Sequence, residues 1–248
     1  MFYQSVASFY DDMTGYSEWA DYSRDAIQSL VSKYPAESLL DSACGTGMYA
    51  IAAARLGIHA TGVDLVPEMI ERSEINAREA GVHVDWHISD IRRLDTAVTE
   101  QHDIILCMGN TIPHLVQDKD LTMACSSFYS SLKEGGILVI EFLNYPRILK
   151  FHERIISINK KAGREFIRFY DFVDLKEIVF NILEIRWKEE GAPERELHSL
   201  KLRPYFPEEV IGSLKRCGFE IEGIWQDLFF HTFHADSSET VLIVVRKK

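Results

Sequence analysis

Three acidic residues stand where short apolar stretches end. Asp41 follows "SLL", Asp64 follows "HATGV" and Asp90 follows "VHVDWHIS". Between the first two, Gly45-x-Gly47-x-x-Ala50 matches the glycine-rich fingerprint of nucleotide-binding loops. A carboxylate that ends the next strand can accept both hydrogen bonds of a ribose diol. The spacing therefore predicts a site for a nucleotide or nucleoside.

The position of Asp41 favours one ligand over another. A dinucleotide places its pyrophosphate on the glycine loop and the helix N-terminus, where Asp41 would repel it. S-adenosylmethionine carries no phosphate, and its cationic part suits Asp41. Its ribose suits Asp64, and its adenine amino group suits Asp90, with Ile91 against the ring. Each acid also fits a purely structural role as the cap of a turn or helix, so NAD and capping remain open alternatives.

Alternating strands and helices must position these acids. Apolar runs predict strands over 39–43, 59–65, 82–90, 102–110 and 137–144. Helical patterns with proline or glycine punctuation predict helices over 47–57, 67–81 and 121–136. This order predicts an α/β fold with a mostly parallel sheet and helices on both faces.

The rest of the chain has a different texture. Strand-like stretches separated by polar turns over about 150–205 predict an antiparallel insertion. A helix is predicted after it, over 207–218. Two closely spaced strands, 219–230 and 239–247, predict a hairpin at the edge of the sheet. Residues 1–36 are expected to form a helical cap, whose tyrosines Tyr10 and Tyr16 either pack on the domain or close over the ligand.

Composition limits the class of protein. The chain has 248 residues, 46% of them hydrophobic, and a net charge of −11, which suits one domain over 1–248. Negative charge disfavours nucleic acid and anionic membranes as partners. The four cysteines contain no Cys-x-x-Cys pair and are expected to be reduced, with no metal site. With no signal sequence or membrane span expected, the predicted location is cytoplasmic.

The stretch "LLDSACGTGMYAIAAARLGIHATGVDL" resembles the signature of class I S-adenosylmethionine-dependent methyltransferases. The resemblance covers residues 9–145 and resumes at "LRPYFPEEVIGSLKRCGF". It implies a Rossmann-like seven-stranded sheet with six parallel strands and one antiparallel strand, the last two forming the edge hairpin. It also implies S-adenosylmethionine as methyl donor and S-adenosylhomocysteine as product, with the insertion serving as a substrate lid.

Two further segments, "ILCMGNTIPHL" and "GGILVIEFLNY", are similar to the glycine/sarcosine N-methyltransferase branch. The resemblance implies that Asn110 and His114 flank the sulfonium and substrate. One position departs from that branch: Leu143 replaces the arginine that holds the carboxylate of glycine. Glycine is therefore disfavoured as the acceptor, whereas methyl transfer is not.

The expected site residues fall into three groups. The predicted catalytic residues are His114 and Asn110, with His114 as base or hydrogen-bond partner. The predicted substrate contacts are Tyr145, Arg147 and His231. The predicted donor contacts are Tyr10, Tyr16, Asp41, Ala43, Gly45, Gly47, Asp64, Leu65, Asp90, Ile91 and Met108.

The expected reaction is transfer of a methyl group to a small molecule, most readily at an amine nitrogen. O-methylation, a protein substrate and a non-catalytic nucleoside-binding role remain alternatives. Aromatic residues of the insertion suit a lid, a core or a homodimer surface, and the sequence leaves these open.

Overall fold

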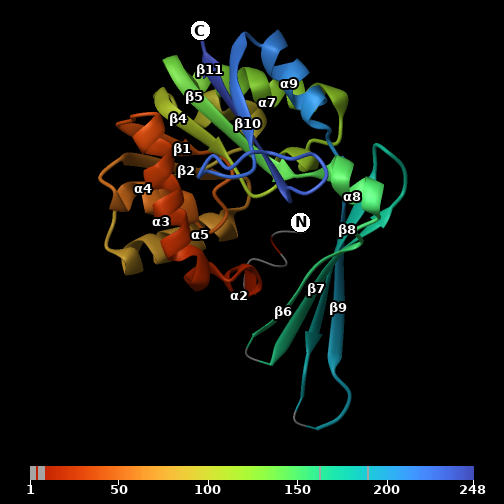
Figure 1. Ribbon diagram of the computed structural model, residues 1–248. Coiled ribbons are helices and arrows are strands. Elements are labelled where there is room, and N and C mark those ends of the chain that lie inside the picture. Colours follow the sequence, from red (N-terminus) through yellow and green to blue (C-terminus); the bar gives the residue numbers. More distant parts are fainter. Residues whose placement is uncertain (1–3, 5–8, 162, 189) are drawn as a thin grey trace.

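The computed structural model describes residue 4 and residues 9–161, 163–188 and 190–248. Its main body is a seven-stranded sheet of order β10-β11-β5-β4-β1-β2-β3 (Figure 1). The strands are β1 (Ser38–Asp41), β2 (His59–Asp64), β3 (Asp85–Ile88), β4 (His102–Cys107), β5 (Leu132–Leu143), β10 (Phe219–Trp225) and β11 (Thr240–Lys247).

Strand direction brings most strand ends to one edge. β1, β2, β3, β4 and β5 pair in parallel, while β11 is antiparallel to β5 and to β10. β10 therefore runs the same way as β5, so six strands end at the same edge. The expected α/β fold, with a mostly parallel seven-stranded sheet and a C-terminal edge hairpin, is confirmed.

Helices cover both faces of this sheet and enclose two cores. β5 shows why: Leu138, Ile140 and Phe142 point into one core, while Ile137 and Val139 point into the other. The first core includes residues of α7 and α9, and the second includes residues of α3, α4 and α5. The helices are α2 (Tyr10–Thr14), α3 (Tyr16–Lys33), α4 (Met48–Arg55), α5 (Pro67–Ala80), α6 (Leu94–Ala97), α7 (Asp118–Ser131), α8 (Tyr145–Phe151) and α9 (Pro207–Arg216), with 3-10 turns η2 (Ile91–Arg93) and η3 (Ile112–His114).

The insertion forms a separate antiparallel sheet, here called the arm. It consists of β6 (Ile155–Lys161), β7 (Arg164–Phe172), β8 (Ile178–Arg186) and β9 (Glu194–Leu202), in that spatial order. Figure 1 shows the arm projecting away from the main sheet. Its root packs into the main core through Tyr170, Ile178 and Leu202. Its middle contacts the N-terminal segment, where the rings of Phe9 and Phe166 stack 5.1 Å apart.

The structure differs from expectation at several element boundaries. β5 begins at Leu132 because the chain leaves α7 before the glycines, and Gly135 and Gly136 lie in a bulge between the pairs His102–Leu132 and Ile104–Ile137. Helices α6 and α8 were not anticipated. Of the expected cap over 1–36, residues 1–3 and 5–8 lie outside the described residues. Within the described chain, no helix combines the length and apolarity needed to span a bilayer.

Candidate functional site

The turn after β1 needs glycine for two different reasons. Gly45 and Gly47 have φ values of +54° and +91°, in the left-handed region that disfavours other residues. At Gly47 a side chain would also overlap its neighbours, because a Cβ would lie 2.6 Å from Cη2 of Trp86 and 3.0 Å from Cβ of Ser73. The turn therefore brings its backbone close to Trp86 and Ser73 where β1 and β2 end.

Asp64 is fixed to this turn. Its Oδ2 accepts a hydrogen bond from the Gly45 amide at 2.8 Å, and its Oδ1 accepts one from the Val66 amide at 2.9 Å. Burial raises the pKa of its carboxyl, and these amides oppose the shift. The next residue, Leu65, is 48% exposed at the rim. The carboxylate is thus held rigidly at the end of β2.

Asp41 has a different environment. It is 1% exposed, and among the described residues neither carboxylate oxygen has a hydrogen-bond partner. Burial, and then the charge of Asp64, raises its pKa to about 7, and the backbone amides of Ala50 and Ala43, which lie nearby without normal hydrogen-bond geometry, partly oppose this. An unpaired buried carboxylate is costly. A cation placed against it would remove that cost, which is the fit expected for the ammonium group of S-adenosylmethionine.

The two N-terminal tyrosines separate in space. A Cβ on Gly45 would lie 3.6 Å from Cε1 of Tyr10, so this ring lies against the glycine turn. Burial, and then the charge of Asp64, raises the pKa of Tyr10 to about 12. Tyr16 instead lines a hollow of about 140 Å³ between α3, α4 and α5, beside Arg55. Only Tyr10 is therefore placed by the structure at the turn.

Asp90 lies in the loop after β3, and both of its carboxylate oxygens already accept hydrogen bonds from Arg92. It caps η2 by accepting from the Arg92 amide at 2.9 Å, and the Arg92 guanidinium pairs with it at 2.5 Å. Ile91 is 8% exposed and packs into the core. The capping role weighed for Asp90 is present in the structure, and its adenine contact stays a prediction.

Asn110 is held in a strained conformation after β4. Its φ is +67°, which is uncommon outside glycine. Its Oδ1 accepts from the Leu143 amide at 3.1 Å, and its Nδ2 donates to the Tyr145 hydroxyl at 2.8 Å. The Tyr145 hydroxyl lies 3.2 Å from that of Tyr170. This network fixes the loop after Met108, which is itself 4% exposed.

Tyr145 was expected at the substrate, but it is fully buried in this network. Its ring belongs to the core below the loop, and its hydroxyl bridges Asn110 and the arm. In this structure Tyr145 supports Asn110 through its hydroxyl, and its contact with substrate stays a prediction.

His114 ends η3, four residues after Asn110. Burial lowers its pKa to about 4, so the imidazole is neutral at pH 7. A neutral ring of such low basicity suits a hydrogen-bond partner better than a general base.

The other expected substrate contacts have local partners. Arg147 pairs with Glu153 at 2.8 Å and reaches the Ser238 carbonyl at 3.5 Å. His231 is in the loop after β10, and its Nδ1 lies 2.7 Å from the Asp227 carboxylate. Its side chain is 69% exposed. That loop stands at the same edge as the glycine turn because β10 runs parallel to β5.

Glu141 was not anticipated. It interrupts the apolar run "ILVIEFL" near the end of β5. Its Oε2 accepts from the Gly109 amide at 3.3 Å. Burial, followed by the charge of Asp227 and against the Gly109 amide, raises its pKa. A lone acid inside a buried strand is the signal that could have revealed it.

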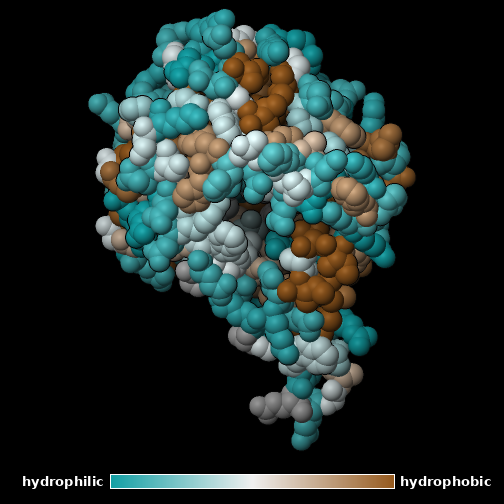
Figure 2. Space-filling view, in the orientation of Figure 1, coloured by the Kyte–Doolittle hydropathy of each residue, from teal (hydrophilic) through white to brown (hydrophobic). Residues whose placement is uncertain are grey.

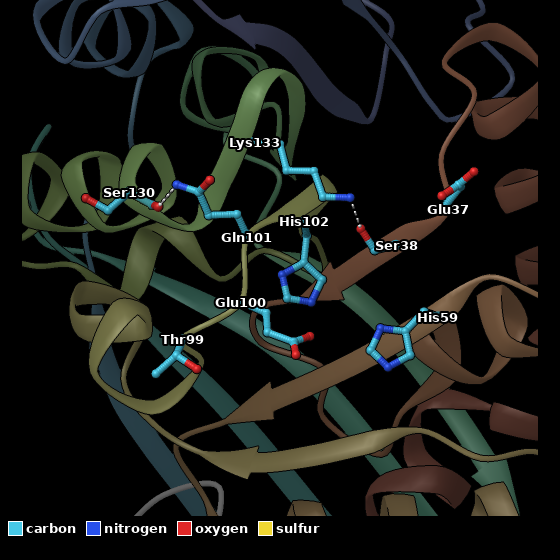
Figure 3. Close-up of a pocket in the computed structure, with 9 residues that line it drawn as sticks. All are labelled: Glu37, Ser38, His59, Thr99, Glu100, Gln101, His102, Ser130 and Lys133. Atoms are coloured by element: carbon cyan, nitrogen blue, oxygen red, sulfur yellow. Dashed lines mark hydrogen bonds between the residues drawn. The ribbon is translucent and has the colours of Figure 1, made fainter.

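A larger hollow lies at the opposite edge of the sheet. It measures about 750 Å³ and is lined mainly by polar groups, including His59, His102 and Lys133 (Figure 3). Its Lys133 is already paired with Asp103 at 2.9 Å. This end holds the starts of the strands, whereas ligands of open α/β sheets bind beyond the carboxyl ends. The unpaired Asp41 likewise places the candidate site at the carboxyl edge, where Figure 2 shows a hollow.

One group on the arm has metal-ligand residue types. Ligand atoms of Glu184, Glu196 and His198 lie within 4.8 Å of one another. Glu184, however, contacts Arg164 at 3.3 Å and Arg186 at 3.2 Å. Two guanidinium groups beside the carboxylate disfavour a divalent cation there.

Sequence comparison connects the glycine turn to a family. Residues 39–136 match the methyltransferase domain family. The chain is 30% identical to the glycine/sarcosine N-methyltransferase of Parasynechococcus marenigrum over 57% of its length and 50% of the relative. It is 27% identical to that of Aphanothece halophytica over 88% of its length and 78% of the relative. It is also 32% identical to the ubiquinone biosynthesis O-methyltransferase of Xanthomonas campestris over 44% of each chain. The chain thus spans about half the length of several of the curated relatives it matches.

Structural comparison covers the whole chain. A methyltransferase of Clostridium acetobutylicum described as S-adenosylmethionine-dependent aligns with a TM-score of 0.80 at 19% identity, over 100% of this chain and 99% of that one. An amino pentose methyltransferase of Micromonospora echinaspora, solved with S-adenosylmethionine bound, aligns with a TM-score of 0.69 at 20% identity, over 93% and 92%. These likenesses establish the fold.

Proposed function

For this chain, which has the class I S-adenosylmethionine-dependent methyltransferase fold and carries the methyltransferase domain in residues 39–136, we propose methyl transfer to a small-molecule amine. The observation that supports this most directly is Asp41, a buried carboxylate without a partner among the described residues, beside a glycine turn. A cationic donor relieves its desolvation cost, whereas pyrophosphate would add to it.

The donor would lie along the ends of β1, β2 and β3. Asp41 would face its ammonium group, Asp64 its ribose diol, and Tyr10 would close over the turn. When bound, S-adenosylmethionine supplies an electrophilic methyl group, whose C–S bond breaks with the electron pair left on sulfur as S-adenosylhomocysteine. The remaining proposed donor contacts are Ala43, Gly45, Gly47, Leu65, Asp90, Ile91 and Met108.

The acceptor side favours nitrogen over oxygen. A phenol or alcohol must lose a proton of high pKa during transfer, and His114 is too weak a base to help at pH 7. An amine needs only to be neutral before it attacks. The chain's role is then to hold the two reactants in line, an effect on the order of 7–11 kcal/mol at its best. Relatives include both N- and O-methyltransferases, so O-methylation is the second candidate.

We further propose that the root of the arm walls the acceptor site. Tyr170 of β7 reaches the Asn110–Tyr145 network, which places the root at the carboxyl edge. The far end of the arm projects away from the sheet (Figure 1). Any lid function therefore belongs to the root of residues 150–205.

The test has two stages. Titration calorimetry should detect binding of S-adenosylmethionine and none of NAD. Transfer of a radiolabelled methyl group should then be measured for separate sets of small amines, phenols and peptides, with the protein omitted as the control. Label in amines alone supports the proposal. Label confined to phenols or to peptides assigns the alternatives, and binding of NAD in place of the methyl donor refutes the function.

A further inference from the structure

We propose that Glu141, with Asp227 and the rings of Tyr22, Tyr49 and Phe229, forms a subsite that binds the acceptor as an amine cation without a neighbouring carboxylate. This inference rests on the proposed methyl transfer and specifies its substrate class.

The position of Glu141 places it beside the donor site. Along β1 and β5, Leu39 and Val139 face the same core, so Asp41 and Glu141, each two residues further on, share that face. Only β4 separates the two strands. In the register Asp41 is level with Leu106, and Leu106 with Val139. Glu141 therefore lies two strand spacings across and two residues further along β5, roughly 12 Å between Cα atoms. One ligand group bound to Asp41 and another bound to Glu141 would therefore lie on opposite sides of the loop that begins after Met108.

The carboxylate of Glu141 has capacity left for a ligand. Its Oε2 accepts one hydrogen bond from the Gly109 amide. Among the described residues its Oε1 has no hydrogen bond, and the carboxylate forms no ion pair with a lysine or arginine. Asp41, 1% exposed with both oxygens unpartnered among the described residues, adds a buried carboxylate on the same face. The donor's ammonium group is assigned to Asp41, so the carboxylate of Glu141, which lies on another strand, is left for a cation of the acceptor.

Aromatic rings lie on the same face of the sheet as this carboxylate, because Tyr49 and Phe229 pack against the core that Val139 faces. Tyr22 of α3 packs edge-on against Phe229 with centroids 5.4 Å apart, which joins the N-terminal helix to the loop after β10. Burial, and then the charges of Asp227 and Glu141, raises the pKa of Tyr22. Burial, and then Glu141, likewise raises the pKa of Tyr49 on α4. The charge of Glu141 thus acts on both phenol groups. Aromatic rings near a carboxylate attract ammonium groups.

The same arrangement repels one class of amine. An amino acid would bring its carboxylate close to Glu141 and Asp227, and Leu143 offers it no countercharge. Asp227 already holds His231 at 2.7 Å, so this imidazole faces a carboxylate of its own. The subsite therefore suits amines whose surroundings are neutral, such as amino alcohols or amino sugars.

Glu141 can also accept the proton that the acceptor's ammonium group must lose before methyl transfer. The bound ammonium group passes one proton to the Glu141 carboxylate, which becomes a neutral carboxylic acid, and the nitrogen keeps its electron pair. That pair then forms the bond to the methyl carbon. Glu141 returns the proton to water when the product leaves.

The experiment compares Glu141→Gln with wild type. Glutamine keeps the size of the side chain and an oxygen for the Gly109 amide, and Glu141 is only partly buried, so the fold should persist. Glu134→Gln is the matched control, because Glu134 is on the same strand at its other end and is 77% exposed. Binding of the probes ethanolamine, glucosamine, glycine and sarcosine to each protein saturated with S-adenosylhomocysteine is measured by calorimetry. Methyl transfer to the same probes is measured with labelled donor.

Loss of one charged contact should weaken binding of ethanolamine or glucosamine about 10- to 100-fold in Glu141→Gln. Donor affinity should stay at the wild-type value, and Glu134→Gln should resemble wild type throughout. Tyr22→Leu should weaken the same probes. Preference for glycine or sarcosine, or equal binding of every probe to wild type and Glu141→Gln, overturns the inference whether or not turnover is seen. Failure of wild type to bind the donor overturns the proposed function instead.

Discussion

Asp41 and Asp64 end adjacent parallel strands at one glycine turn, yet only Asp64 has hydrogen-bond partners among the described residues. The two carboxylates therefore differ in what they need. Asp64 is already fixed by backbone amides, whereas Asp41 lacks a positive partner. The predictions below begin from this difference.

Donor binding should release a proton through Asp41. Its pKa of about 7 in the free protein exceeds the ordinary value, so a bound cation must first displace the proton. We expect donor affinity to fall as pH drops from 7 to 5.5, by at most about tenfold per unit. The ammonium group of the donor stays protonated over this pH range, because the pKa of an α-amino group is about 7.7. Calorimetry in two buffers of different ionisation enthalpy measures the proton directly.

Asp41→Asn should bind the donor more weakly at pH 7 and show no such pH dependence. The free energy of unfolding should change with pH in the opposite direction to donor affinity. A raised carboxyl pKa makes the free wild-type protein less stable as pH rises from about 4 through 7. Asp95→Asn, at an exposed position, is the control. A wild-type affinity that is constant from pH 7 to 5.5 would contradict the assignment of Asp41.

Asp64→Ala should weaken donor binding about 100-fold or more, since two hydrogen bonds from a diol to a carboxylate are lost at about 1.5–3 kcal/mol each. The same change frees the amides of Gly45 and Val66, so thermal unfolding must be recorded beside calorimetry. Asp64→Asn separates the effects because it retains an acceptor for one amide. Unchanged affinity in a folded Asp64→Ala protein would exclude the ribose role.

Gly47→Ala should destabilise the fold through contact with Trp86 as well as through its backbone. A Cβ there lies 2.6 Å from the indole, and overpacking costs about 1–3 kcal/mol. Gly57→Ala isolates the backbone cost, since Gly57 has φ +80° and open space around it. Urea unfolding should show Gly47→Ala to be the less stable of the two. Adding Trp86→Leu should recover part of the difference, and no recovery would mean that backbone strain alone acts.

His114 should support turnover without titrating near neutral pH. Burial lowers its pKa to about 4, so the pH profile of kcat should show no inflection between 6 and 8 that disappears in His114→Gln. His114→Gln should retain more activity than His114→Ala, because glutamine can replace a neutral hydrogen-bonding ring. His231→Gln, at an exposed position, is the comparison. An inflection near 6.5 that is lost only in the His114 variants would restore a general-base role.

The sequence could predict the order of elements because local signals specify them. Proline at 67 and glycines at 57 and 81 punctuate helices, and apolar runs mark buried strands. The boundary at Leu132 was missed because the bulge around Gly135 depends on pairing with β4, which lies outside any local pattern. Helix α8 was missed because the apolar pattern extended the predicted strand to Asn144, which in the structure caps the helix that follows directly.

By itself, the sequence determined that acids stand at successive strand ends around a glycine turn, because parallel topology carries strand ends to one edge. Only the tertiary structure decided which groups of the protein already contact each acid. Arg92 engages Asp90, amides engage Asp64, and Asp41 is buried without a partner among the described residues. It also decided that Tyr145 is buried and that Glu141 accepts a hydrogen bond from the Gly109 amide. Such pairings join residues distant in the chain, and packing, which no local pattern encodes, brings them together.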